Sequence, residues 1–219
     1  MLLSVPVKTP LLVQKLLPGL HFSMKGEEKL IYLTFDDGPL PDFCPWILQC
    51  LKDHKAKATF FLVGENAAAN PKITRQIIDE GHSIGNHTQN HLNGFKTRVQ
   101  DYVSNVNQCH QVLKPFLSET ERLLFRPPYG KIRPAQARAL RKAGFEIIMW
   151  DVLSKDYDPS LSAESIYNNV MSHAGPGSIP VFHDHIKSAK NLRIALPRIL
   201  ESLSNQGYRF EAIRLPLKG

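Results

Sequence analysis

The sequence predicts an α/β fold: a distorted (β/α) barrel of about seven parallel strands, related to the eightfold barrel. From residue 30 onward, short runs rich in Val, Ile, Leu, Phe and Tyr alternate with longer helical patterns, which is typical of right-handed βαβ units. An eightfold barrel commonly needs about 250 residues, and only about 190 follow residue 29, so a reduced barrel fits better. The alternative is an open doubly wound sheet, but no Gly-x-Gly-x-x-Gly follows the first strand.

Seven strands and six intervening helices are predicted in order along the chain. Each strand run is bounded by Gly, Pro, Asn or Asp, which favour turns. The strands are expected at residues 30–36, 58–63, 82–87, 123–127, 146–152, 178–183 and 208–213. The helices are expected at residues 42–54, 71–80, 97–117, 134–143, 163–173 and 188–205. Pro71 and Pro134 suit a first helical turn, and Gly81 and Gly144 suit left-handed caps after helices.

Charge and cysteine content exclude several classes of protein. Lys and Arg number 27 against 20 Asp and Glu, a formal net charge of +7. The excess lies in residues 1–29 and 187–219, whereas residues 30–186 are balanced, and no nucleic-acid-binding signature accompanies it. We therefore expect no nucleic-acid partner. Cys44, Cys50 and Cys109 lack the paired spacing of a zinc site or a disulfide scaffold, which predicts unpaired thiols.

The N-terminal segment is apolar but differs from a membrane span. Residues 11–18 are interrupted by Lys15 and Pro18 and fall short of the roughly 20 residues that a span requires. The early basic region and cleavage site of a signal peptide are also missing. The expectation is a cytoplasmic protein without a transmembrane segment, with peripheral membrane association as an alternative. Residues 1–29 are predicted to be an extension and residues 30–219 a single domain.

Polar side chains gather at the carboxyl ends of the predicted strands. In a β/α barrel these ends meet on one face, where catalytic groups collect. Five strands are involved, and they contribute Asp36 and Asp37, His87 with His91 just beyond, Arg126, Asp151 and Asp156, and His183. We therefore expect these groups to surround a single site.

The carboxylates and imidazoles among these groups indicate a metal centre. Adjacent carboxylates such as Asp36 and Asp37 repel each other unless a cation compensates, although such a pair could also cap a helix. His87 and His91, four residues apart, would share one face of a helical turn, unless both are surface or capping histidines. Two histidines and one carboxylate leave coordination positions open, which is typical of a catalytic metal that activates water and polarises a carbonyl.

Five ordered segments together resemble the motifs of the NodB-homology polysaccharide deacetylases, carbohydrate esterase family 4. They lie at residues 34–39, 87–91, 126–129, 150–157 and 181–183, and the resemblance runs from about residue 30 to residue 213. It implies a metal-dependent hydrolase that removes N-acetyl groups from amino sugars in a chitin-oligosaccharide- or peptidoglycan-type glycan. Two alternatives remain: a deacylase acting on a non-sugar amide or an O-acetyl ester, and a non-catalytic carbohydrate-binding relative.

The resemblance also implies roles for individual residues. Asp37, His87 and His91 would bind the divalent metal, most often zinc in this family, with cobalt or nickel as alternatives. Asp36 would be the general base for the water that the metal activates. Arg126 would pair with Asp36 and keep it anionic.

The remaining motif residues would complete the reaction. His183 would be the general acid that protonates the leaving amine, oriented by Asp156. Tyr129 would offer its backbone N–H to the developing oxyanion. Tyr157, where the family usually has Trp, and Trp150 would line the substrate groove together with Tyr129.

Several other polar residues are expected to lie outside the site. His185 is predicted to point away from it, because side chains alternate along a strand. Asp151 is predicted to be structural, as a hydrogen-bond partner of Arg126. Structural roles are expected for His21, His54, His82, His110 and His173. No motif indicates the oligomeric state.

Overall fold

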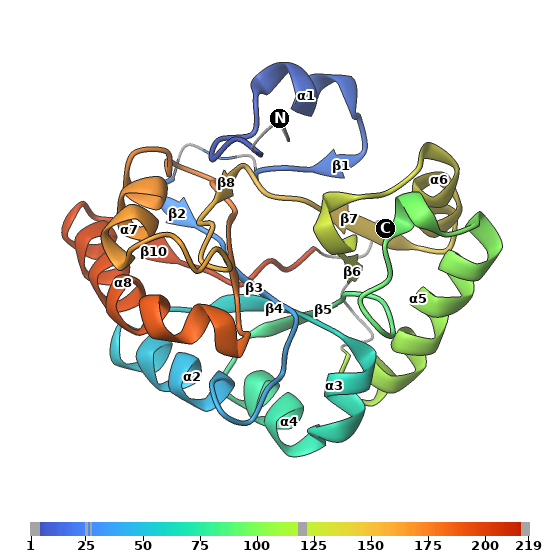
Figure 1. Ribbon diagram of the computed structural model, residues 1–219, viewed down its shortest axis with the longest axis horizontal. Coiled ribbons are helices and arrows are strands. Elements are labelled where there is room, and N and C mark those ends of the chain that lie inside the picture. The colour runs from blue at the N-terminus through green and yellow to red at the C-terminus, as the bar shows by residue number, and fades with distance from the viewer. Residues whose placement is uncertain (1–4, 25, 27, 118–121, 216–219) are drawn as a thin grey trace.

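The computed structural model describes residues 5–24, 26, 28–117 and 122–215. Its centre is a curled, all-parallel sheet of eight strands in the order β1-β7-β6-β5-β4-β3-β9-β8, with helices along the outside (Figure 1). These strands are Leu20–His21 (β1), Leu33–Asp36 (β3), Ala58–Leu62 (β4), Ser83–Asn86 (β5), Leu123–Phe125 (β6), Phe145–Ile148 (β7), Val152–Leu153 (β8) and Pro180–His183 (β9). The predicted distorted barrel is confirmed.

All six predicted helices are present, with ends shifted by a few residues. They are Cys44–Asp53 (α2), Pro71–Asp79 (α4), Val99–Leu113 (α5), Pro134–Lys142 (α6), Ala163–Met171 (α7) and Ile186–Asn205 (α8). Pro71 and Pro134 occupy first turns, and Gly81 and Gly144 have φ of 81° and 92°, as predicted. Two six-residue helices, Leu11–Leu16 (α1) and Gly64–Ala69 (α3), were not predicted, since each is too short to show a helical period.

The strands differ from the prediction in three places. The run at 30–36 splits into β3 and a separate strand, Leu30–Ile31 (β2), which pairs with Arg209–Phe210 (β10) outside the main sheet. The run at 146–152 also splits, because β7 pairs with β6 whereas β8 pairs with β9. The N-terminal segment adds β1 beside β7. Strand pairing therefore depends on partners that a local pattern does not show.

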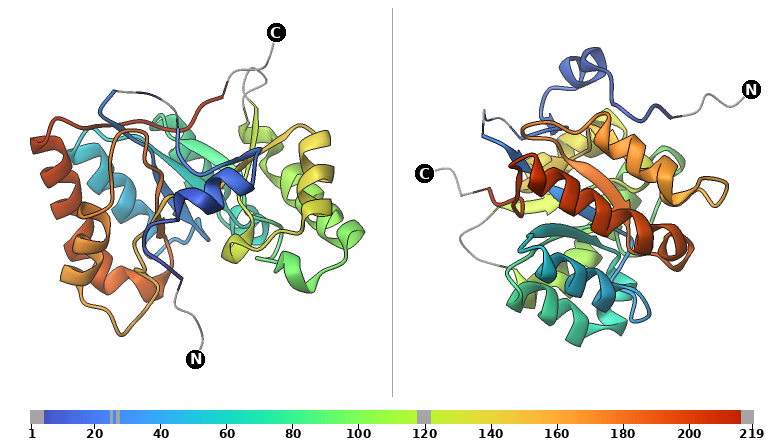
Figure 2. Two further views of the ribbon diagram at one scale, coloured as in Figure 1. Left: turned by 90° about the horizontal axis from the view of Figure 1, so that it is seen from above. Right: turned by 90° about the vertical axis from the view of Figure 1, so that its left-hand side faces the viewer.

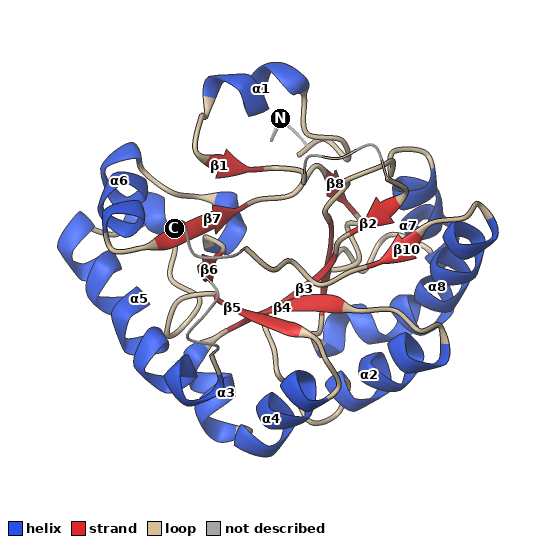
Figure 3. Cartoon of the chain, turned by 180° about the vertical axis from the view of Figure 1, so that it is seen from behind, coloured by secondary structure: helices blue, strands red, loops and turns tan. Residues whose placement is uncertain are grey.

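The N-terminal segment joins the two edges of the curled sheet (Figure 3). Lys8 forms an antiparallel bridge with Val152 of β8, and β1 extends the other edge beside β7. Figure 2 shows α1, between these two contacts, standing out from the body of the barrel. The boundary between residues 29 and 30 stays a prediction, and residues 1–4, 25, 27, 118–121 and 216–219 lie outside the described residues.

Aromatic and aliphatic side chains fill the space between the sheet and its helices. Phe35 stacks on Phe60 and Phe182, with ring centroids 5.1 and 5.6 Å apart. The buried face of α5 carries Tyr102 and Val106, which lie four positions apart. The three cysteines are buried and form no disulfide, as expected.

Across the described residues, no helix combines the length and apolar character that crossing a bilayer requires.

Candidate active site

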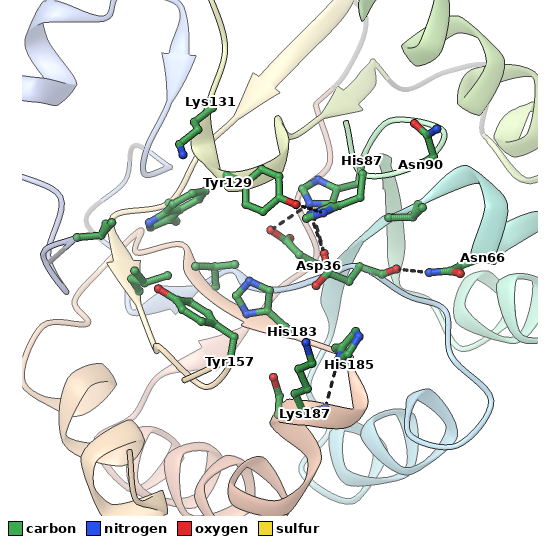
Figure 4. A pocket seen from close by; sticks show the side chains of 18 of the residues that line it. Asp36, Asn66, His87, Asn90, Tyr129, Lys131, Tyr157, His183, His185 and Lys187 are labelled. Carbon is green, nitrogen blue, oxygen red and sulfur yellow. Dashed lines mark hydrogen bonds and ion pairs between the residues drawn. The ribbon is translucent and has the colours of Figure 1, made fainter. Parts of the chain in front are cut away.

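The carboxyl ends of the strands surround a pocket of about 750 Å³. This volume is in the usual range for small-molecule sites. Figure 4 shows side chains from several strand ends pointing into it. The lining includes eight of the predicted site residues: Asp36, Asp37, His87, His91, Tyr129, Trp150, Tyr157 and His183. The remaining two, Arg126 and Asp156, are buried and bonded to members of this set.

Asp37, His87 and His91 form a cluster with the donor set of a metal site. One ligand atom from each lies within 4.8 Å of the others. Oδ1 of Asp37 is 3.1 Å from Nε2 of His91 and 3.7 Å from Nε2 of His87. This oxygen is buried and has no aligned hydrogen-bond partner among the described residues. Two imidazole nitrogens and an unsatisfied carboxylate oxygen fit a divalent cation such as Zn²⁺, Co²⁺ or Ni²⁺.

The other ring nitrogens of both histidines are engaged, which leaves each Nε2 for a ligand role. Nδ1 of His87 lies 2.8 Å from the carbonyl oxygen of Arg126, and Nδ1 of His91 lies 3.0 Å from the hydroxyl of Tyr129. Such outer contacts orient metal-binding imidazoles. Burial lowers the pKa of His87 to about 4 despite the opposing charges of Asp36 and Asp37, so its ring is neutral at physiological pH.

A tight turn, rather than the predicted helical turn, brings the two histidines together. Thr88 and His91 have φ of 66° and 57°, in the left-handed region. Oδ1 of Asn86 accepts the Thr88 N–H at 2.9 Å, and Oγ1 of Thr88 accepts the Leu92 N–H at 2.8 Å. These bonds hold a conformation that non-glycine residues seldom adopt.

Arg126 is fully buried and binds the predicted base. Its Nη1 donates to Oδ1 of Asp36 and to Oγ1 of Thr34, both at 2.7 Å. Its Nη2 and Nε donate to the carbonyl oxygens of Met149 and Ile148. A buried guanidinium is tolerated when charge and hydrogen bonds satisfy it in this way. One oxygen of Asp36 is thus fixed, and Oδ2 lies 3.9 Å from Nε2 of His87.

The predicted contact between Asp151 and Arg126 is wrong. Asp151 instead accepts hydrogen bonds from Lys8 Nζ, Ser178 Oγ and Ile179 N, all within 2.8 Å. Asp151 lies between β7 and β8 and is not among the residues that line the pocket.

His183 and Asp156 form a second bonded pair. Nδ1 of His183 lies 2.8 Å from Oδ1 of Asp156, whose other oxygen accepts the His183 backbone N–H. Oγ of Ser154 also donates to Oδ1 of Asp156. Burial lowers the pKa of His183, but the charge and hydrogen bond of Asp156 outweigh it and raise that pKa to about 9. The ring therefore carries a proton at neutral pH.

Aromatic side chains form part of the pocket wall. Tyr129 has φ of 60° and is 58% exposed at the rim, and its hydroxyl contacts His91. The ring of Tyr157 lies edge-on to His183, with centroids 5.1 Å apart. The indole of Trp150 lies against Gly130, where an added Cβ would be 2.8 Å from the ring. The three positions predicted to contact substrate therefore border the cavity.

Other residues of the site were not predicted from the sequence. Oδ1 of Asp184 accepts the Gly38 N–H at 2.5 Å, and Nδ2 of Asn66 donates to the Asp37 carbonyl at 2.7 Å. Asn90, Lys131 and Lys187 also line the pocket. None belongs to a recognisable spacing, so no sequence signal was available for them.

His185 departs from its prediction, because it also lines the pocket. Strand β9 ends at His183, so alternation no longer directs the side chains that follow. His185 instead caps α8 by accepting the Lys187 N–H at 3.1 Å.

The five remaining predicted structural histidines do not line this pocket. Nδ1 of His82 accepts the Ala58 N–H, and burial lowers the pKa of His82 to about 4. His21 pairs with Glu146. The others bind carbonyls of their own helices or contact an aromatic ring, namely His54, His173 and His110.

Comparison with known proteins gives a consistent set of similarities. A family model described as "Polysaccharide deacetylase" matches residues 23–148. A peptidoglycan-N-acetylglucosamine deacetylase of Bacillus cereus is 36% identical over 196 residues, which cover 88% of this chain and 90% of the relative. A chitooligosaccharide deacetylase of Azorhizobium caulinodans is 34% identical over 154 residues, covering 70% of this chain and 73% of the relative.

A solved structure is also similar in fold. The crystal structure of a peptidoglycan N-acetylglucosamine deacetylase in complex with 4-naphthalen-1-yl-N-oxidanyl-benzamide has a TM-score of 0.85 and 36% identity to this chain. The match covers 94% of this chain and 95% of that one.

Proposed function

Because the chain belongs to the polysaccharide deacetylase family, the NodB-homology proteins of carbohydrate esterase family 4, we propose that it removes N-acetyl groups from a peptidoglycan- or chitin-type glycan. It is a hydrolase of the N-acetyl amide bonds of sugars. The mechanism proposed for this reaction is supported by one arrangement of side chains. The two bonded pairs Asp36–Arg126 and His183–Asp156 lie at the same pocket as the Asp37–His87–His91 cluster.

We propose that Asp37, His87 and His91 hold a divalent metal, with zinc as the first candidate. The unsatisfied oxygen of Asp37 and the two oriented imidazoles support this assignment. When bound, such an ion supplies Lewis-acid polarisation of the acetyl carbonyl and acidifies a water molecule.

Asp36 is the proposed general base. Its Oδ1 is occupied by Arg126, so Oδ2 is the oxygen left to accept the proton of the attacking water. Burial lowers the pKa of Arg126, and the charge and hydrogen bond of Asp36 oppose that shift. A guanidinium bound to this carboxylate has only N–H donors and no acceptor for that proton. Arg126 therefore fixes the orientation of Asp36 and compensates its charge.

His183 is the proposed general acid. Its pKa of about 9 keeps it protonated at neutral pH, and Nδ1 is bound to Asp156, so Nε2 is the donor toward the leaving amine. Asp156 stabilises the imidazolium and fixes the ring. Amide hydrolysis needs two proton transfers: Asp36 accepts the proton of the attacking water, and His183 donates a proton to the leaving amine.

Tyr129, Tyr157 and Trp150 are proposed to receive the substrate. The positive φ of Tyr129 turns the backbone at the rim of the pocket, and its N–H is the proposed oxyanion donor. Aromatic rings are suited to the apolar faces of pyranose rings. Tyr157 is smaller than an indole and carries a hydroxyl, which adds a hydrogen-bonding group beside His183.

The direct test is acetate release from N-acetylglucosamine oligomers and from peptidoglycan. We expect turnover with zinc or cobalt, loss of activity after chelation, and a fall in kcat of roughly 100- to 10,000-fold in Asp36→Asn. The matched control is Asp42→Asn, an acidic residue of the same loop region that does not line the pocket. Acetate release from acetylxylan alone would indicate an O-acetyl esterase. Glycan binding without turnover on any substrate would indicate a binding protein.

A further inference from the structure

Among the described residues, the densest run of exposed apolar side chains lies on α1 and on Leu17, which follows it. Leu11, Leu12 and Leu16 are 69%, 67% and 68% exposed, and Val13 and Leu17 are exposed as well. No residue of α1 is buried. Single exposed apolar residues are ordinary on protein surfaces, but five on one short segment are not. We call these five residues the α1 surface.

The α1 surface is held in place at both of its ends. Before α1, Thr9 donates its N–H to the Asp151 carbonyl at 2.8 Å and its hydroxyl to the Trp150 carbonyl at 2.9 Å. After α1, strand β1 pairs with β7. Figure 2 shows the helix raised above the barrel between these attachments. The apolar side chains are therefore presented by an anchored loop.

One cationic side chain of α6, that of Arg141, lies beside the end of the α1 surface, and further cations are exposed on the same helix. Gly19, two residues beyond it, lies against the guanidinium of Arg141 on α6, so closely that an added Cβ would overlap it. Arg138, Arg141 and Lys142 are exposed on α6, and no carboxylate of the described residues pairs with them. Residues 5–24 and 131–144 contain no Asp or Glu. This side of the molecule is therefore apolar and basic.

We propose that the α1 surface and the neighbouring cations of α6 bind an anionic lipid bilayer. Leucine side chains can enter the boundary between headgroups and acyl chains, while Arg and Lys contact anionic headgroups. A second copy of the chain fits less well, because pairing this face with itself would oppose the same cations. One short segment gives reversible attachment, as peripheral proteins show. The inference does not depend on the proposed enzymatic function.

The test is sedimentation of the full chain with vesicles. We expect binding to phosphatidylcholine vesicles that contain phosphatidylglycerol, weaker binding to phosphatidylcholine alone, and further weakening by salt. The double variant Leu12→Ser/Leu16→Ser should bind at least about tenfold more weakly, since it removes inserted apolar area. The triple variant Arg138→Gln/Arg141→Gln/Lys142→Gln should lose the preference for anionic lipid.

Matched controls come from other faces of the molecule. Ile194→Ser replaces an apolar side chain that is 54% exposed on α8, and Lys52→Gln/Lys72→Gln/Lys190→Gln removes three exposed cations elsewhere. These controls should bind like the unmodified chain, and thermal unfolding should show that all variants fold. The proposal would be overturned if the unmodified chain did not bind vesicles, or if the Leu12/Leu16 variant bound them equally well. It would also be overturned if the chain formed a dimer that the Leu12/Leu16 substitutions abolish and bound no lipid.

Discussion

At the scale of single residues, Asp37 combines a proposed ligand role with an unusual backbone conformation. Its φ is 87°, which costs a non-glycine residue about 1–3 kcal/mol. Three hydrogen bonds from other segments hold it: its N–H donates to Phe61, its carbonyl accepts from Asn66, and the next N–H, that of Gly38, donates to Asp184. The orientation of the carboxylate therefore depends on three neighbouring elements.

Gly38 should tolerate no side chain. A Cβ at this position would overlap the carboxylate of Asp184, which is fully buried and cannot move into solvent. We expect Gly38→Ala to destabilise the protein by about 2–4 kcal/mol, measured by urea unfolding. In Gly175→Ala the added Cβ meets nothing within 4 Å, so its effect should stay within about 0.5 kcal/mol. Equal unfolding midpoints for both variants would contradict the packing argument.

The His183–Asp156 pair should set the alkaline limit of activity. The pKa of His183 is raised to about 9 by Asp156, so kcat/KM should fall as pH rises through about 9 and the acid loses its proton. Asp156→Asn should move that limb toward lower pH. An alkaline limb that is identical in Asp156→Asn would contradict the role of this pair.

The same raised pKa affects stability. The pKa of His183 in the folded protein exceeds its unfolded value of 6.5. The contribution of His183 to the free energy of unfolding is therefore fully present below pH 6.5 and is lost as pH rises through about 9. Asp156→Asn should therefore reduce stability most near and below pH 6.5, as measured by thermal unfolding across pH. A loss of stability that grows toward alkaline pH would have the wrong sign.

At the scale of elements, the N-terminal segment closes the curled sheet by contacting both of its edges. Residues 7–9 follow the edge at β8, and β1 follows the edge at β7. Asp151 connects the N-terminal segment to the residues just before β9 by accepting hydrogen bonds from Lys8, Ser178 and Ile179. The closing segment thus lies outside the region that carries the family motifs.

Substitution of Asp151 should lower the free energy of unfolding more than substitution of its partner Lys8. Asp151→Ala removes a buried acceptor of three hydrogen bonds and should cost about 2–4 kcal/mol. Lys8 is 39% exposed, so Lys8→Met should cost about 1 kcal/mol or less. Urea unfolding of both variants checks the difference. Equal costs would mean that the ion pair, rather than the backbone and hydroxyl contacts, is the main contribution.

At the scale of the whole molecule, the proposed metal would link two strand ends, and a third supports one of its ligands. Asp37 follows β3, whereas His87 and His91 follow β5, and Arg126 after β6 orients His87. A ligand that binds only the native state stabilises it by mass action, by about 2.7 kcal/mol at 100 times its dissociation constant.

Removal of divalent metal should therefore lower the melting temperature. We expect zinc to raise the melting temperature of the chelated protein, and His91→Gln to abolish most of that increase. His185→Gln is the matched control, because it changes an imidazole of the same pocket that is absent from the cluster. The ligand assignment would be contradicted if zinc still raised the melting temperature of His91→Gln while His185→Gln lost that increase.

Much of the fold and site could be predicted because the relevant signals are local. The alternation of strand and helix patterns and the positions of Pro71 and Pro134 at helix starts each depend on residues a few positions apart. The motif residues also follow a local rule, since each lies at the carboxyl end of a strand or in the loop that follows it. In a parallel barrel that position alone places side chains on one face.

Strand pairing and the polar contacts between distant segments became apparent only in the folded molecule. The division of residues 146–152 into β7 and β8, the contacts of Asp151, and the positions of Asp184 and His185 all depend on segments distant in sequence. Asp184 contacts Gly38 because β9 lies beside β3, and Asp151 contacts Lys8 because the N-terminal segment lies at the β8 edge. Local sequence patterns therefore identify the chemical groups of the site, whereas the packing of distant segments fixes how each group is held.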